Sequence, residues 1–152
     1  MAYKRLGEFI ERVDKFKSHS LSLKDVRGVS ITKKFTPTKA NMSGVDISGY
    51  NVVNVGQFAF NPNTARMGNK ICVALNDEAP FLVSKIYPVF QVKKPDELLP
   101  EFLYLFFARE EFDRYVRFNS WGSARETFDF EDFCEIEIPL PPIEKQREYV
   151  AI

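Results

Sequence analysis

The sequence predicts an α+β fold, with a twisted, mostly antiparallel sheet or sheets, a helical segment near residues 95–118 and the start of a C-terminal helix. Before residue 95, short apolar runs are separated by turns rich in Gly, Pro and Asn, which is typical of antiparallel strands. Within 95–118 the apolar residues recur instead at helical spacing. Close to the C-terminus, three prolines stop a last strand, and a helical pattern follows them.

The strands are predicted from runs of apolar and alternating residues. They are expected at 17–35, 51–60, 71–75 and 81–92. The segment 17–35 is expected to contain strands around a turn at Arg27-Gly28. Pro88 predicts a bulge or an edge position within the last run. Residues 6–15 fit either a short helix or a strand that ends near Ile10.

The helices are predicted from spacing and from their start signals. Pro100 suits the first position of the helix within 95–118, and a break near Ala108 divides this helix in two. A strand is then expected over residues 131–138. The last helix begins near Pro142. Its apolar residues lack evident partners, so it is expected to fray.

Length and composition indicate one globular domain. The chain has 152 residues, of which 45% are hydrophobic and 14% aromatic, with 15 Phe and 6 Tyr. No apolar run is long enough for a membrane span and no signal peptide opens the chain, so a soluble, cytoplasmic protein without membrane contact is expected. Cys72 and Cys134 stand apart and are predicted to be buried thiols.

The net charge of zero hides two oppositely charged halves. Residues 1–70 hold 12 Lys or Arg against 5 Asp or Glu, giving +7, and residues 71–152 hold 9 against 16, giving −7. Such asymmetry fits a side that faces a polyanion. It fits equally well two halves of an ordinary domain joined by salt bridges, so charge alone does not choose between these readings.

The residues that carry enzyme chemistry are missing from the sequence. His19 is the only histidine, and it lies in a polar stretch more typical of a solvated surface than of a catalytic base. With two separate cysteines besides, no zinc site of ordinary ligand count can be written. Asn61-Pro62 matches only half of the Asn-Pro-Pro-aromatic motif of amino-methyltransferases, and Gly-rich phosphate loops are absent. A chain without catalytic or metal-binding residues is therefore expected.

Residues 61–70, NPNTARMGNK, form a polar segment without acidic residues between two apolar runs. Amide side chains can pair with two groups on adenine, and Arg can form two hydrogen bonds to guanine. The segment therefore suits the reading of DNA bases. The alternative is an exposed hairpin loop in which Asn and Gly serve only their backbone freedom.

Residues 122–150 resemble the end of a target recognition domain in the DNA specificity subunit of type I restriction–modification systems. The resemblance rests on an Ile-Pro-Leu-Pro-Pro strand, residues 138–142, that runs into a helix with Glu144, Gln146, Arg147 and Val150. Residues 50–61, with Val-Gly-Gln-Phe, and residues 83–90 resemble two further strands of that family. Leu6-Gly7-Glu8 fits its opening.

The resemblance implies that the chain recognises one half of a bipartite target on double-stranded DNA. Modification subunits would methylate adenine with S-adenosylmethionine, and a motor-nuclease restriction subunit would cleave. This chain itself would hold no cofactor, and a second half-subunit is a further expected partner. Residues 1–138 would be the recognition domain, and 139–152 a Pro-rich connection with the first turns of a truncated spacer helix.

The candidate site residues divide by role. Those expected to read bases are Asn61, Asn63, Thr64, Arg66, Ser123 and Arg125. Those expected to contact phosphates are Arg27, Lys33, Lys34, Lys39 and Lys70. Those expected to contact partner subunits are Glu144, Gln146, Arg147 and Val150. The rival interpretation is a protein-interaction module that docks a partner through residues 144–152 without touching DNA. One concave face formed by the basic residues between 27 and 70 would favour DNA.

Overall fold

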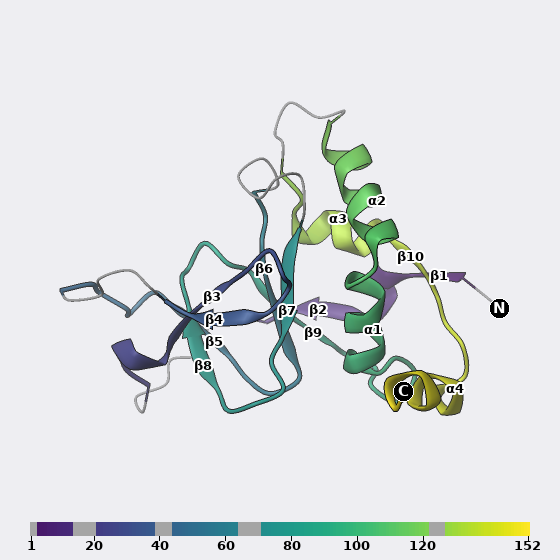
Figure 1. Cartoon of the computed structure of the whole chain (residues 1–152), viewed down its shortest axis with the longest axis horizontal. Coiled ribbons are helices and arrows are strands. Elements are labelled where there is room, and N and C mark those ends of the chain that lie inside the picture. Colours follow the sequence, from purple (N-terminus) through teal and green to yellow (C-terminus); the bar gives the residue numbers. More distant parts are fainter. Residues whose placement is uncertain (1–2, 14–20, 39–43, 64–70, 122–126) are drawn as a thin grey trace.

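The computed structural model describes residues 3–13, 21–38, 44–63, 71–121 and 127–152 (Figure 1). The fold is α+β with mostly antiparallel sheets, as the sequence predicts. The strands are β1 Tyr3–Arg5, β2 Ile10–Arg12, β3 Val26–Val29, β4 Phe35–Pro37, β5 Asn51–Val53, β6 Gln57–Asn61, β7 Cys72–Leu75, β8 Phe81–Val83, β9 Val89–Val92 and β10 Glu137–Pro139. The helices are α1 Pro100–Phe107, α2 Glu110–Trp121, α3 Phe130–Glu135 and α4 Ile143–Val150, with short 3-10 turns at Leu6–Glu8 and Leu23–Asp25.

Two four-stranded sheets and one strand pair make up the β-structure. The central sheet has the order β2-β9-β6-β7 and is antiparallel throughout. The outer sheet has the order β4-β3-β8-β5, in which only β3 and β8 run parallel. Separately, β1 pairs with β10 and so joins the two ends of the domain. Figure 1 shows the outer sheet on one side of the central sheet and the helices on the other.

The central sheet is covered on both faces, which explains why every residue of β6 is buried. Because side chains alternate along a strand, Phe58 and Phe60 point to the helices while Ala59 points to the outer sheet. On the helical side, Phe58 stacks on Phe90 with ring centroids 5.0 Å apart, and Phe60 lies 4.7 Å from Phe133. The abundant phenylalanines therefore form the core between sheet and helices.

The helical segment divides where the sequence predicts. Pro100 is the first residue of α1, and α1 ends at Phe107 while α2 begins at Glu110. In contrast, the prediction of a strand over residues 131–138 is wrong for most of that segment. Residues Phe130–Glu135 form α3, and the strand is confined to Glu137–Pro139.

Three further expectations are corrected by the strand pairing. Residues 81–92 form two strands in different sheets, β8 and β9, and Pro88 lies between them. Arg27-Gly28 lies inside β3, and the turn falls at residues 30–34, where the N–H of Ser30 bonds the carbonyl of Lys34. Residues 51–60 also divide, because Gly56 has a φ of 87° in a turn before β6. Neither reading of residues 6–15 is correct as stated, because a 3-10 turn spans Leu6–Glu8 and the strand β2 begins at Ile10 instead of ending near it.

Candidate nucleic-acid interface

The sequence predicts two polar segments that contact DNA. The start of the first segment, at Asn63, lies beside the residue that follows the second, Thr127. Asn63 and Thr127 form an isolated antiparallel β-bridge, and the N–H of Phe128 donates to the carbonyl of Pro62 at 2.8 Å. Figure 1 shows β6, β7 and α2 reaching the same end of the molecule, where these bonds lie. The anchors of residues 64–70 and 122–126 are therefore joined, although they are far apart in the sequence.

The first anchor is rigid because it continues the central sheet. Asn61 pairs with Cys72 at the end of the β6–β7 ladder. The Asn61 side chain is only 7% exposed, and its Oδ1 accepts a hydrogen bond from the N–H of Asn63 at 3.0 Å. This bond shapes the turn after β6. Asn61 was expected to read bases, but its burial assigns it to the shape of the loop base.

The second anchor is held by the helical core. Phe128 is 1% exposed, and its ring lies 5.1 Å from that of Phe133 in α3. The N–H of Asp129 donates to the Asp132 carboxylate at 2.7 Å, as in a capping box at the start of α3. Thr127 is thus fixed between the central sheet on one side and a capped helix on the other.

Six of the remaining candidate residues lie outside the described residues. These are Lys39, Thr64, Arg66, Lys70, Ser123 and Arg125. Asn63 is described and half-buried at the bridge. The assignment of base-reading residues therefore stays a prediction from the sequence.

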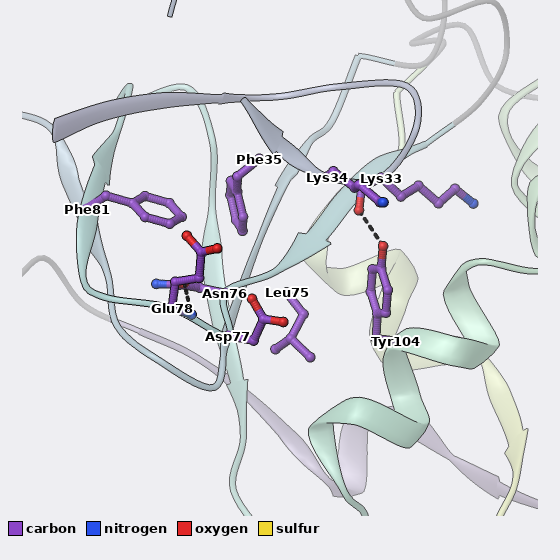
Figure 2. Close-up of a pocket in the computed structure, with 9 residues that line it drawn as sticks. All are labelled: Lys33, Lys34, Phe35, Leu75, Asn76, Asp77, Glu78, Phe81 and Tyr104. Atoms are coloured by element: carbon purple, nitrogen blue, oxygen red, sulfur yellow. Dashed lines mark hydrogen bonds between the residues drawn. The ribbon is translucent and has the colours of Figure 1, made fainter. Parts of the chain in front are cut away.

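Lys33 was expected to contact phosphate. It is instead buried, and its ammonium group bonds other residues of the domain. Its Nζ donates to the carbonyl of Phe107 at 2.5 Å and to Asp113 Oδ1 at 2.8 Å, and the residue is 6% exposed. Tyr104 donates its hydroxyl to the Lys33 carbonyl at 2.7 Å, as Figure 2 shows. Burial, and then the charge of Asp77, raise the pKa of Tyr104, so this hydroxyl stays protonated and able to donate.

Lys34, the next residue, is exposed and lines a cavity of about 340 Å³. The same cavity is lined by the exposed carboxylates of Asp77 and Glu78 (Figure 2). The lining of this cavity therefore carries charges of both signs and is not a purely positive surface. Arg27 donates to the carbonyls of Lys24 and Val26 at 3.0 and 3.1 Å. The basic residues that the structure describes between 27 and 63 thus do not form a single basic face.

The four candidates for partner contact all lie on α4, and their side chains differ in exposure. Glu144, Arg147 and Val150 are exposed. Gln146 has no exposed surface and makes three hydrogen bonds inside the domain, so it is not available to a partner. The sequence could not indicate this, because a glutamine on a polar helix is ordinarily at the surface.

The described ranges contain no cluster of three or more His, Cys, Asp or Glu side chains that could hold a metal ion. Among the helices in those ranges, none has the length and apolar character needed to cross a membrane. Sequence reasoning did not indicate that Thr127 and Phe128 would pair with Asn63 and Pro62. Both contacts are backbone pairing between distant segments, which leaves no local signal in a single sequence.

Solved structures share this fold. One is a chain from a structural study of complex assembly and conformational transition of the type I R-M system, with a TM-score of 0.58 and 17% identity. Another is the HsdS subunit from Thermoanaerobacter tengcongensis, with a TM-score of 0.52 and 17% identity. A third is the type I restriction–modification S subunit from M. genitalium, with a TM-score of 0.61 and 14% identity. Each alignment covers 99% of this chain and between 35% and 37% of the other, so the chain spans little more than a third of their length.

No curated protein matches the sequence. The family described as "Type I restriction modification DNA specificity domain" matches residues 4–152, which is nearly the whole chain. That match includes both loop anchors and α4. The chain therefore belongs to the family of type I restriction modification DNA specificity domains.

Proposed function

We propose that this domain recognises a specific DNA sequence, as one half of a bipartite target, within a type I restriction–modification complex. Membership of the specificity-domain family supports the assignment. The structural observation that supports this proposal is the bridge between Asn63 and Thr127. It joins the anchors of two segments that offer side-chain hydrogen-bond donors, Thr64 and Arg66 in one and Ser123 and Arg125 in the other.

The chemistry of these segments suits bases. Asn63 and Thr64 offer an amide and a hydroxyl, while Arg66 and Arg125 offer guanidinium groups that can form two hydrogen bonds to guanine. Base reading needs side chains held to within a fraction of an ångström, and a site built at the end of a buried sheet meets that need better than a free loop. The anchors at Asn61 and Phe128 supply this support.

Phosphate contacts would add affinity without sequence information. Lys34 is the exposed described candidate, and Lys39 and Lys70 are further candidates from the sequence. In the proposed complex, modification subunits methylate adenine with S-adenosylmethionine and a motor-nuclease subunit cleaves. The specificity domain then contributes no catalytic group, and its role is to place the other subunits on the target.

A protein-interaction module is the second candidate function. Exposed apolar side chains near α1 and α4 favour it, among them Leu105, which is 43% exposed, and Tyr149, which is 48% exposed. With Tyr3 they line a cavity of about 380 Å³ between α1, α4 and the β1–β10 pair. Such a surface suits a protein partner. It is compatible with DNA recognition elsewhere on the domain, so the test has to address DNA directly.

The test is a binding selection on randomised duplexes, using the chain assembled with its matching modification subunits. Enrichment of one short sequence is expected. The matched control omits this chain from the assembly and should enrich nothing. If the complete assembly forms but selects no sequence, the DNA-reading proposal fails and the interaction module remains.

A further inference from the structure

Helix α4 is held to the domain in an unusual way. Of its eight residues, only Gln146 is buried, and its exposed surface is 0%. The apolar residues of the helix are more accessible: Tyr149 is 48% exposed and Val150 is 36% exposed. The residue that enters the domain interior is thus the polar one, where an amphipathic helix would ordinarily insert an apolar side chain.

The amide of Gln146 makes three of the four hydrogen bonds open to such a group. Its Oε1 accepts from the N–H of Leu99 at 2.8 Å. Its Nε2 donates to the carbonyl of Glu97 at 2.8 Å and to that of Pro141 at 2.9 Å. One acceptor faces a donor and two donors face acceptors, so the orientation of the amide is fixed by its partners.

These three partners belong to two different parts of the chain. Leu99 precedes the first turn of α1, and no side chain caps that helix, so the Gln146 oxygen serves one of its free N–H groups. Glu97 lies in the turn before α1, whereas Pro141 lies in the connection between β10 and α4. Gln146 therefore ties the last helix both to the start of α1 and to the connection that leads from β10 into α4.

Hydrogen bonds and apolar contacts constrain a helix differently. Apolar burial is non-directional, so a helix resting on apolar contacts alone can roll or tilt at little cost. The contact of Tyr149 with Phe102, at 6.0 Å between ring centroids, is of this kind. Hydrogen bonds weaken steeply when their angles change. Three of them at one buried amide fix the angle and the rotation of α4 together.

We infer that Gln146 is a positioning residue that sets the direction in which α4 leaves the recognition domain. Anything joined to α4 is then held at a constant angle to the end of the domain where Asn63 and Thr127 meet. The consequence for DNA rests on the proposed function. In a bipartite target, a constant angle fixes the spacing between the half-site read here and the rest of the assembly.

The first arm of the test measures the direction of α4 without DNA. Spin labels are placed at Arg147→Cys on α4 and at Lys85→Cys in the turn after β8, in a Cys134→Ser background. Both label sites are exposed, whereas Cys72 is buried and its pKa is raised to about 11, so it reacts slowly. Pulsed EPR should give one narrow distance distribution in this reference protein.

Two variants and one matched control follow. Gln146→Met removes all three hydrogen bonds and keeps the side-chain length, while Gln146→Glu keeps the acceptor for Leu99 and removes both donors. Each should lose the single narrow distribution. Lys145→Met changes the exposed neighbour, whose ammonium pairs with Glu148 at the surface, and should keep the single narrow distribution. Unchanged distributions in both Gln146 variants overturn the inference. Loss of cooperative folding of the whole domain in both Gln146 variants also overturns the inference. Gln146 would then stabilise the core and would not set the direction of α4.

The second arm uses the assembly with its modification subunits and duplexes in which the spacing between half-sites is correct, or longer or shorter by one base pair. Gln146→Met loses all three hydrogen bonds and should reduce discrimination between spacings by about tenfold or more. Discrimination between bases within the half-site should be kept. If the unsubstituted assembly selects no sequence, the proposed function fails while the EPR arm still decides the role of Gln146. If it selects correctly and Gln146→Met keeps its spacing discrimination, the inference alone is overturned.

Discussion

The ammonium group of Lys33 lies 2.8 Å from the carboxylate of Asp113 and ties the β3–β4 turn to the start of α2. Both side chains are largely removed from water, at 7% and 18% exposure. The same ammonium bonds the carbonyl of Phe107, the last residue of α1, and lies 5.2 Å from the centre of the Phe112 ring. One lysine from the outer sheet thus fixes the junction of the two helices.

Removing Asp113 should destabilise the domain more than removing Lys33. Asp113→Ala leaves a buried ammonium with a carbonyl as its principal partner, and breaking such a pair costs about 3 kcal/mol. Lys33→Met leaves a carboxylate that retains some access to water, so its cost is smaller. Urea unfolding of each variant measures the difference. Lys34→Met, an exposed neighbour, is the control and should stay within about 0.5 kcal/mol of the unsubstituted protein. Equal effects of Lys33→Met and Lys34→Met would contradict the structural role of Lys33.

A second prediction concerns Gly7, which lies against α3. A Cβ at this position would come within 2.9 Å of both the Cβ and the carbonyl oxygen of Cys134, and a backbone atom cannot move aside cheaply. Gly7→Ala should therefore lower the free energy of unfolding by about 1–3 kcal/mol. Gly28→Ala in β3 is the matched control, since its nearest neighbour, Thr36 Oγ1, is 3.9 Å away. The comparison uses thermal or urea unfolding, and similar stability of the two variants would speak against a close approach at Gly7.

The elements that sequence analysis located correctly are those that local signals specify. The break between α1 and α2 and the start of α1 at Pro100 follow from spacing and from the preference of proline for a first helical position. The alternation of apolar and polar residues over 131–138 led to a wrong prediction of a strand. A helix of six residues has too few positions to show the helical period of apolar residues. The pair Asp129 and Asp132 at capping-box spacing was the signal that could have indicated α3.

What could not be predicted depends on contacts between distant segments. The division of residues 81–92 is decided by pairing, since β8 joins β3 and β5 while β9 joins β2 and β6. The donor-rich segments were recognised from composition, but the meeting of Asn63 with Thr127 was not. Lys33 and Gln146 were placed at the surface because polar residues usually lie there. Their burial depends on partners that local sequence does not reveal.

The pH dependence of stability should carry a contribution from Cys72. Burial raises the pKa of this thiol from 9.0 to about 11. The folded protein then keeps a proton that the unfolded chain releases, so the contribution to stability is complete below pH 9 and is lost as the pH rises toward 11. Burial also raises the pKa values of Tyr87 and Tyr104, which adds a loss of the same sign at higher pH.

The share of Cys72 can be isolated by comparison with Cys72→Ala. The cavity left by the substitution costs a similar amount at every pH. The stability difference between the two proteins should therefore shrink between pH 9 and pH 11, as followed by urea unfolding at several pH values. A difference that stays constant over this range would show that the thiol titrates alike in the folded and unfolded chains.

The chain alone should not methylate DNA. The prediction rests on its sequence, which offers no cofactor loop and no nucleophile with a base, and on its membership of the specificity-domain family. Pure protein is incubated with DNA and tritiated S-adenosylmethionine, with the assembly that includes modification subunits as positive control. Transfer of tritium to DNA by the chain alone, above that of a heat-treated sample, would refute the assignment to recognition.

The last prediction separates base reading from phosphate contact, using Arg66 and Lys34. Arg66 lies in the segment that follows the rigid anchor at Asn63, and a guanidinium there is expected to read a base. In the full assembly, Arg66→Ala should cost about 1–3 kcal/mol on the cognate duplex and relax discrimination at one base position. Lys34→Ala should weaken cognate and non-cognate duplexes alike and lower the salt slope by about one ion. Affinities for cognate and singly substituted duplexes across a salt series distinguish the two. If Arg66→Ala weakens every duplex equally or changes nothing, the segment 61–70 is not a base-reading loop, because a substitution at a residue that reads a base must cost more on the sequence it reads.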